Sequence, residues 1–511
     1  MGQAPTQTVA IPLSAEAASP YVRLPGALWV LFGAMAVAGL LTPNPLLTAT
    51  SILLLPVFIS LLWRPGETPV LLFAVSFQWL QVTAKVFHAN VLGLDVTELS
   101  EYAVLDLPLI EQAVWLGLAG LVVLAVGMRV GMWKLSGGNS ARAQSEAYHF
   151  SPDRAFILYL VFAAFDMLLE AYAWSFGGFI QVVRAAGGIK WVAFFILGYV
   201  VLKRREHYSL FAIAVLIEFV GGIGFFSGFK TVIFVTLIIA FTVRHRLKPA
   251  TVAFALVLLA LLLLFGATWT SVKSEFRAYL NQGTSQQAVL VSRADQFQKL
   301  GELISDVDGH DLGESVGELF GRIAYVDYFA LVLEYVPTYT PHEEGAVWKQ
   351  SITHVLTPRA FFPDKPSLLS DSEMTMQYTG LHLASDDQGT SISIGYMGES
   401  YIDFGPYGMF VPIFILGVMW GLMYTYFVSR SRFVIVGYAF ATTLLLNAYQ
   451  FEMASIKLLG GVLMKFLVLA MIMYLVERYM GRWLQGREQS NQVTTIGTLA
   501  HEGEGSYGGR L

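Results

Sequence analysis

The segment Thr251–Thr270, TVAFALVLLALLLLFGATWT, contains no charged residue. A helix that crosses a membrane needs about 20 mostly apolar residues, and this segment has that length. The longest polar interruption of the chain, Ser271–Tyr401, follows it directly. The sequence therefore predicts a membrane helix that leads into a large segment outside the lipid.

The overall composition agrees with a membrane protein. Of the 511 residues, 55% are hydrophobic and only 14% are charged, whereas a soluble domain carries about 25% charged residues. The chain has no cysteine, which excludes disulfide bonds, thiolate metal sites and a cysteine nucleophile. The net charge of -5 does not indicate a class of partner, because membrane proteins distribute charge by side of the membrane.

Apolar segments recur along the chain. We expect an all-α polytopic integral membrane protein with about 12 transmembrane helices, because backbone in lipid must satisfy its own hydrogen bonds. The predicted spans are Leu24–Leu41, Leu46–Trp63, Pro69–Phe87, Gln112–Met132, Arg154–Trp174, Lys190–Leu202, Ser209–Phe226, Lys230–Val243, Thr251–Thr270, Phe404–Phe427, Phe433–Glu452 and Leu458–Tyr479. The expected parts are a disordered cytoplasmic tail (1–23), an N-terminal bundle (24–270), a periplasmic catalytic loop (271–403), C-terminal membrane helices (404–480) and a second disordered cytoplasmic tail (481–511).

The basic residues predict the orientation. The linkers at 203–205, 244–248 and 429–432 are basic, while 88–111 holds five acidic residues and no Lys or Arg. The positive-inside rule puts the basic linkers in the cytoplasm and the acidic segment outside. Both termini are then cytoplasmic, and Ser271–Tyr401 faces outward.

Two parts of this outer segment have helical periodicity. Gln286–Leu303 and Glu314–Val336 carry apolar residues at helical spacing, which predicts amphipathic helices at the membrane interface or capping the bundle. Between Pro337 and Gly398 the chain is rich in Pro, Gly, Asp and Ser. We expect a loop without regular structure there, and its aromatic content argues against disorder.

The stretch TPRAFFPDKP, Thr357–Pro366, places Arg359 and Lys365 among prolines that fix backbone angles. Arg offers a planar fork of donors that suits phosphate, and Lys offers a point charge. Two such cations at the bilayer edge suit a lipid-linked diphosphate. The alternative is a structural turn in which Asp364 bridges to one of them.

The stretch GESYIDFG, Gly398–Gly405, lies where the chain re-enters the membrane. A partly desolvated carboxylate such as Glu399 has a raised pKa and can act as a general base. The alternative is that Glu399 and Asp403 simply end an outer loop, with Tyr401 as an aromatic anchor at the headgroups.

Other charged residues are weaker candidates. Lys230, Lys273, Arg277 and Arg322 would bind phosphate or extend toward headgroups. His354 is a second candidate base, and the histidines show no spacing that predicts a metal site. Some ionisable residues fall inside predicted spans, where such residues are functional by default or pair with one another. Among them are Asp166, Glu170, Glu218 and Lys465.

The chain resembles the Wzy-type oligosaccharide repeat-unit polymerases of bacteria. The likeness rests on an ordered set of features: Gly228-Phe229-Lys230, then Arg277, then Gly345 and Trp348 ahead of Pro358-Arg359 and Phe362–Pro366, then Gly398–Tyr401. It implies an inner-membrane glycosyltransferase that polymerises undecaprenyl-diphosphate-linked oligosaccharide into O-antigen or exopolysaccharide at the periplasmic face. It also implies no metal, no cofactor and no nucleic acid, and it allows a chain-length regulator and other assembly proteins as partners in the lipid bilayer.

The resemblance also implies roles for residues. Arg277 and Arg359, with Lys365, Arg322 and Lys230, would stabilise the diphosphate leaving group, and Asp364 would join this substrate-binding set. Glu399 is the first candidate base and His354 the second. Tyr401 and Trp348 would stack on sugar rings.

Three alternatives remain open. An O-antigen-type ligase would transfer the same glycan to another acceptor. A transporter or flippase would use Asp166, Glu170, Glu218 and Lys465 along a pathway. A non-catalytic assembly protein would use the outer segment to bind partners.

Overall fold

The computed structural model describes residues 24, 26–99, 108–135, 137–172, 177, 180–222, 229–244, 249–283, 289–307, 309–357, 362, 364–365, 368–383 and 391–485. Within these ranges the regular structure is helical, apart from one isolated β-bridge between Phe150 and Gln485.

The helices of the first half of the chain are α1 (Gly26–Gly39), α2 (Pro45–Leu62), α3 (Val70–Leu92), the short η1 (Val96–Leu99), α4 (Pro108–Gly131), α5 (Asn139–His149), α6 (Pro152–Tyr172), α7 (Ile180–Ala186), α8 (Ile189–Arg204), α9 (Tyr208–Gly221), α10 (Phe229–Val243) and α11 (Pro249–Leu280).

The second half contains α12 (Arg293–Asp306), α13 (Gly309–Ile323), α14 (Val326–Tyr335), α15 (Ala346–Leu356), α16 (Asp371–Thr379), α17 (Gly395–Gly408), α18 (Phe410–Arg430), α19 (Val434–Leu445), η4 (Leu446–Tyr449), α20 (Ser455–Tyr479) and α21 (Gly481–Leu484).

The protein is an all-α membrane protein. Seven helical segments of the described chain are long and apolar enough to cross a membrane: Pro45–Leu62, Val70–Leu92, Leu109–Gly131, Pro152–Tyr172, Val182–Arg204, Phe410–Arg430 and Ser455–Tyr479. Shorter apolar helices lie at Gly26–Gly39, Tyr208–Gly221, Lys230–Val243 and Val434–Tyr449. Each of these segments overlaps a span predicted from the sequence.

Helices α4 and α18 pack with their backbones in close approach. Gly127 and Gly131 on α4 face Gly417 and Gly421 on α18, each pair four residues apart. A Cβ at Gly421 would lie 2.2 Å from the carbonyl oxygen of Met128. Small residues at this spacing let membrane helices approach closely enough for extensive van der Waals contact.

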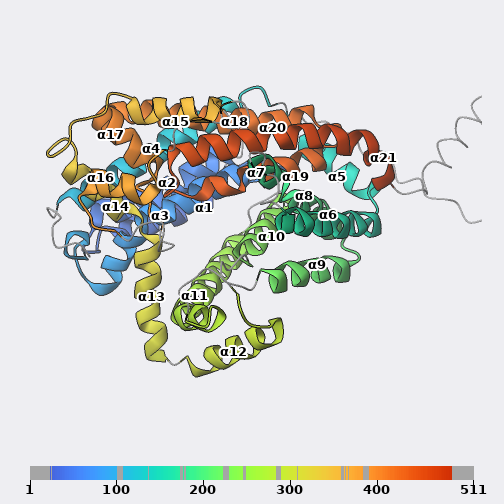
Figure 1. The fold of residues 1–511 in the computed structure, drawn as a ribbon, viewed down its shortest axis with the longest axis horizontal. Helices are drawn as coiled ribbons and strands as arrows, with labels where there is room; N and C mark the ends of the chain where they lie inside the picture. The colour runs from blue at the N-terminus through green and yellow to red at the C-terminus, as the bar shows by residue number, and fades with distance from the viewer. Residues whose placement is uncertain are drawn as a thin grey trace, which may run out of the picture.

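The helices are arranged with two distinct ends and one lateral group. Helices α15, α16 and α17 gather at one end, and α20 runs from there to the opposite end, where α5 and α21 lie (Figure 1). Helices α11, α12 and α13 pack together to one side, away from α15 and α17.

The predicted amphipathic helix Glu314–Val336 is wrong as a single element. The chain leaves the helical path at Ala324 and Tyr325, so the apolar face is shared between α13 and α14. The helix predicted over Gln286–Leu303 begins only at Arg293, because the Ser292 hydroxyl caps it by accepting a hydrogen bond from the Asp295 N–H.

The prediction of a loop between Pro337 and Gly398 is also wrong, because α15, α16 and the start of α17 lie there. Turn residues in this segment cap short helices. Ser370 and Glu373 form a capping box that starts α16, and Gly380, in a left-handed conformation with φ 69°, ends it.

The predicted span Phe404–Phe427 does not begin a new helix at Phe404. Phe404 belongs to α17, the backbone breaks at Gly405 with φ 67° and ψ -170°, and α18 begins at Phe410. Glycine adopts this conformation without the penalty that a Cβ would impose. The break sets α17 apart from the membrane-spanning α18.

Candidate functional site

Helix α17 presents two buried carboxylates on one face. Glu399 and Asp403 lie four residues apart, so they project from the same side of the helix. Glu399 is 1% exposed and Asp403 is 2% exposed. Each carboxylate receives backbone N–H groups from the start of a different neighbouring helix.

Asp403 caps the N-terminus of α15. Its two carboxylate oxygens accept hydrogen bonds from Val347 N–H at 3.0 Å and Trp348 N–H at 2.8 Å. The N-cap residue of α15 is Gly345, with φ 93°, which has no side chain to satisfy these N–H groups. Asp403 therefore supplies from α17 the cap that the local sequence lacks.

Glu399 caps the N-terminus of α20. Its carboxylate accepts the Ser455 N–H at 2.7 Å, and the N-cap residue Ala454 makes no side-chain cap. The Ser455 hydroxyl also bonds to the Glu399 carboxyl. Ser455 Oγ lies 2.9 Å from Ser351 Oγ on α15. A chain of hydroxyl groups therefore links Glu399 to α15.

The pKa of Glu399 is raised to about 7, first by burial and then by the charges of Asp371 and Asp403, against the lowering effect of the Ser455 hydrogen bonds. Burial also raises the pKa of Asp403, while the Trp348 and Val347 N–H groups oppose that shift. Glu399 can therefore take up or release a proton near neutral pH.

Helix α15 is held at several further points. The Trp348 indole N–H donates to Ser400 Oγ at 3.1 Å, and the indole is buried. The Lys365 ammonium donates to the carbonyl oxygen of His354 and, at 2.9 Å, to that of Thr357. Lys365 thereby satisfies carbonyl groups at the C-terminus of α15.

The structure brings several predicted site residues together around α15 and α17. Trp348 and His354 lie on α15, Lys365 binds its C-terminus, and Glu399 lies on α17. Tyr401 is also buried on α17, where its hydroxyl donates to the Val336 carbonyl at 3.3 Å. Its ring contacts His342, with ring centroids 5.5 Å apart. Asp364 is exposed beside Lys365.

Other predicted residues lie elsewhere or outside the description. Arg359 and the side chain of Arg322 lie outside the described residues. Arg277 lies on α11, in the lateral group away from α15 (Figure 1). Lys230 is exposed in the first turn of α10, one turn before Phe234, whose ring packs against Phe77 with centroids 5.3 Å apart.

A polar face of α3 was missed by the sequence analysis. Gln81 donates to Glu452 at 2.5 Å, and Lys85 forms a buried ion pair with Asp327 of α14. Gln78 accepts the Tyr396 hydroxyl at 2.7 Å. The signal was the spacing of Gln78, Gln81 and Lys85 on one side of an apolar helix.

A second set of charges lies among the apolar helices, with Glu218 buried and Asp166 and Lys190 half-buried. The Lys190 ammonium is 3.1 Å from both Asp166 and Glu218, and the Tyr159 hydroxyl donates to Glu218 at 3.0 Å. The expectation that Asp166, Glu170, Glu218 and Lys465 pair with one another is therefore wrong for Asp166 and Glu218, because both pair with Lys190 at the start of α8.

The other two intramembrane candidates lie nearby. Glu170 is exposed on α6, one turn beyond Asp166. Lys465 donates to the Thr443 carbonyl at 2.7 Å.

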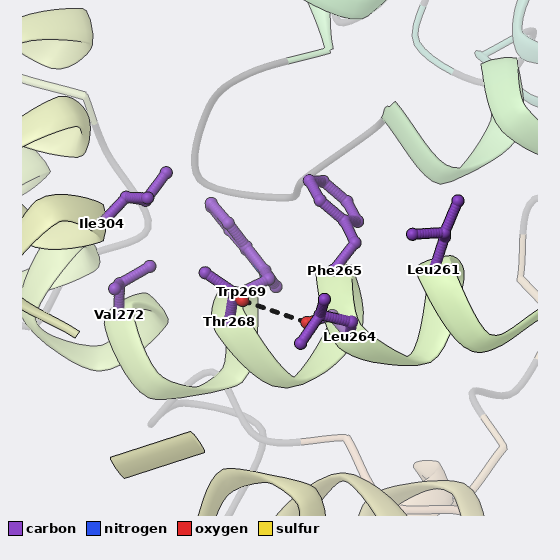
Figure 2. Close-up of a pocket in the computed structure, with 7 residues that line it drawn as sticks. All are labelled: Leu261, Leu264, Phe265, Thr268, Trp269, Val272 and Ile304. Atoms are coloured by element: carbon purple, nitrogen blue, oxygen red, sulfur yellow. Dashed lines mark hydrogen bonds between the residues drawn. The ribbon is translucent and has the colours of Figure 1, made fainter. Parts of the chain in front are cut away.

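An apolar hollow of about 290 Å³ lies between α11 and α12 (Figure 2). Its walls are Leu261, Leu264, Phe265, Thr268, Trp269, Val272 and Ile304. The one hydroxyl there, on Thr268, donates to the Leu264 carbonyl of its own helix at 3.0 Å. The hollow therefore offers apolar contact and no group for acid–base chemistry.

Among the described residues, no group of three or more His, Asp or Glu side chains is arranged to hold a metal ion.

Fold and site together define a helical membrane protein with two buried carboxylates, Glu399 and Asp403, at one end of its helix bundle. The chain belongs to the family described as a domain of unknown function, DUF8712, whose match covers residues 68–480. This range starts just before α3 and ends just after α20, so the carboxylates of α17 and those around Lys190 lie within it. No curated protein and no solved structure matches the chain.

Proposed function

We propose that this protein polymerises lipid-linked oligosaccharide repeat units at the outer face of a bacterial inner membrane. In this proposal the chain crosses the membrane about 12 times, both termini are cytoplasmic, and the segment 271–403 forms the periplasmic catalytic part. The observation that supports this proposal most directly is the placement of four predicted site residues around α15 and α17, outside the candidate spans. Trp348 and His354 lie on α15, Glu399 lies on α17, and Lys365 is bonded to the end of α15.

The reaction is the transfer of a glycan from its diphosphate carrier to a sugar hydroxyl. The bond between the anomeric carbon and the diphosphate oxygen breaks, and a bond to the acceptor oxygen forms. The lipid diphosphate leaves with the bonding electrons, and the acceptor proton passes to a base. No external energy source is required, because the diphosphate is the activated leaving group.

Glu399 is the proposed base. Its pKa of about 7 suits proton transfer near neutral pH. Because the carboxyl is 1% exposed, the proton would arrive through the hydroxyls of Ser351 and Ser455, whose oxygens are 2.9 Å apart. His354, three residues after Ser351, is the second candidate.

The cations would stabilise the diphosphate as charge develops on it. Arg359 is the first of these. Lys365 is the second, and its ammonium is bonded to the carbonyl groups of His354 and Thr357 at the end of α15. Arg277, Arg322 and Lys230 belong to the same proposal as further cations.

The test is the cell-surface polysaccharide of a deletion strain, complemented with wild type and with Arg359→Ala. Loss of the polymer ladder on deletion, with single repeat units left, and failure of Arg359→Ala to restore it at normal membrane abundance support polymerisation. Accumulation of polymerised glycan on the carrier would instead identify a ligase. An unchanged surface glycan would overturn both.

A transporter or flippase is the second candidate function, and one observation favours it. The candidate span Val182–Arg204 is interrupted near Gly188, whose N–H donates to Asp166 at 2.8 Å beside Lys190. Broken helices with ionisable residues mark binding sites in transporters. Retained long-chain polymer after neutralising Asp166 and Glu218 would count against this function.

A further inference from the structure

A second group of polar side chains is organised around the segment 391–396, next to Glu399. The Ser393 N–H donates to the Tyr325 oxygen at 3.1 Å, and the Ser391 hydroxyl donates to Asp371 at 3.2 Å. The Tyr396 N–H donates to the Met453 carbonyl at 2.9 Å. One short segment therefore brings together the starts of α14 and α16 and the chain that leads into α20.

Two aromatic rings form part of this group. The rings of Tyr325 and Tyr328 lie 4.9 Å apart, tilted by 38°, and both side chains are half-buried. The Tyr325 oxygen accepts from Ser393, so its own O–H proton is left to be donated to another oxygen. Such rings offer an apolar face and a polar edge to the same ligand.

Two carboxylates flank the tyrosines. Glu452 is half-buried and accepts from Gln81 of α3 at 2.5 Å. Asp371 is bound by the Lys457 ammonium, and the Lys457 side chain is 53% exposed. Burial is the main cause that raises the pKa of Tyr325, and the charges of Glu452 and Asp371 raise it further. Both carboxylates therefore lie within electrostatic range of one phenol.

This group adjoins the proposed base. Lys457 follows Ser455 by two residues in the first turn of α20, and Ser455 donates to Glu399 at 2.7 Å. The charge of Asp371 also acts on Glu399. A ligand bound beside Lys457 would thus lie near the hydroxyl chain that leads to Glu399.

We propose that Tyr325, Tyr328, Asp371, Glu452 and Lys457 form a carbohydrate subsite that binds the acceptor sugar. Carboxylates accept hydrogen bonds from neighbouring sugar hydroxyls, Lys457 donates one, and the tyrosines cover the apolar face of the ring. The two carboxylates outnumber the single lysine, so the site repels a diphosphate and favours an uncharged, polyhydroxylated ligand. This inference rests on the proposed function and names the acceptor end of its substrate.

The probe is the repeat-unit oligosaccharide released by mild acid from the carrier lipid of the deletion strain. Its binding to the full-length protein in lipid nanodiscs is measured by calorimetry for wild type, Glu452→Gln and Tyr328→Leu. The controls are Glu302→Gln on α12 and Tyr148→Leu on α5, both exposed and outside the group. We expect at least about tenfold weaker binding for the two site variants and no more than about twofold for the controls.

Equal binding by wild type and the two site variants would overturn the subsite, as would no binding by wild type. If deletion has meanwhile abolished the polymer ladder, the proposed function stands without this subsite. If deletion leaves the ladder intact, the proposed function falls and the acceptor assignment falls with it. Thermal unfolding of each variant shows whether it is folded, and Tyr328→Phe, which keeps the ring, is expected to bind like wild type.

Discussion

The carboxylates of α17 and the carboxylates around Lys190 are stabilised in different ways. Asp166 and Glu218 share the Lys190 ammonium, each at 3.1 Å. Glu399 and Asp403 instead accept backbone N–H groups at the starts of α20 and α15. No ion pair to either of them occurs among the described residues.

This difference indicates a structural role for the carboxylates around Lys190 and a chemical role for Glu399. The Lys190 ammonium supplies a compensating positive charge to Asp166 and Glu218. Burial without a cation leaves Glu399 with a pKa of about 7, so this group can exchange a proton at physiological pH. We therefore place proton chemistry at α17 and a stabilising role at Lys190.

The largest expected effect on stability is that of Lys190→Met. The substitution leaves Asp166 and Glu218 without their shared cation. Breaking a buried ion pair costs about 3–5 kcal/mol, and this range is an upper bound here because the Lys190 side chain is 24% exposed. Denaturant unfolding in mixed micelles measures the loss. The triple variant with Asp166→Asn and Glu218→Gln should recover all but about 1 kcal/mol. A stable single variant would show that Lys190 does not hold the two carboxylates.

The pH dependence of stability should differ between wild type and Glu399→Gln. Folding raises the pKa of Glu399 from 4.5 to about 7, so the folded state binds more protons than the unfolded state between these values. The contribution of Glu399 to the free energy of unfolding is therefore present in full below pH 4.5 and is lost as the pH rises to about 7. The loss is at most about 3 kcal/mol. Thermal unfolding at about pH 5 and about pH 8 measures it. If the melting temperatures of wild type and Glu399→Gln changed equally with pH, the raised pKa of Glu399 would be contradicted.

Asp403→Ala should weaken α15 locally. It removes the acceptors of the Val347 and Trp348 N–H groups, and loss of an N-cap costs about 0.5–2 kcal/mol. Hydrogen exchange at these two amides should become faster, while Asp364→Ala, at an exposed carboxylate, leaves it unchanged. Unaltered protection in Asp403→Ala would show that another group caps the helix.

The smallest expected effect is that of Lys365→Met at the other end of α15. A cation near a helix C-terminus contributes about 0.3–1 kcal/mol, and the substitution removes its bonds to the carbonyls of His354 and Thr357. Thermal unfolding should show a small loss that Lys365→Arg largely avoids. A loss as large as that of Lys190→Met would mean that Lys365 holds more than this helix end.

The membrane helices were largely predictable from sequence, because hydropathy over about 20 residues is a local property. The apolar segments of α2, α3, α18 and α20 were all identified in this way. Helices α15 and α16 were not predicted. The N-cap residue of α15, Gly345, has no side chain, and the helix is capped instead by Asp403, 58 residues later in the chain. No local sequence pattern therefore predicts this helix.

The candidate site was predictable only in part. The motif with Glu399 and Asp403 was predicted to be partly desolvated where the chain re-enters the membrane, and both side chains are buried. The partners of Glu399, Ser455 and Ser351, come from other elements. The roles of Lys85 and Lys190 were not predictable either, because both depend on tertiary contacts. An isolated lysine in an apolar segment does not reveal which carboxylate it meets, because that partner lies on a different helix.

The most direct test of the central claim compares Glu399→Gln with the triple variant Lys190→Met, Asp166→Asn, Glu218→Gln in the deletion strain. The measured quantity is the surface polysaccharide ladder at equal membrane abundance. The ladder should be lost with Glu399→Gln, since removing a general base lowers the rate by about 10²–10⁴-fold, and kept with the triple variant. A ladder kept by Glu399→Gln and lost by the triple variant would place the chemistry at Lys190 and contradict this account.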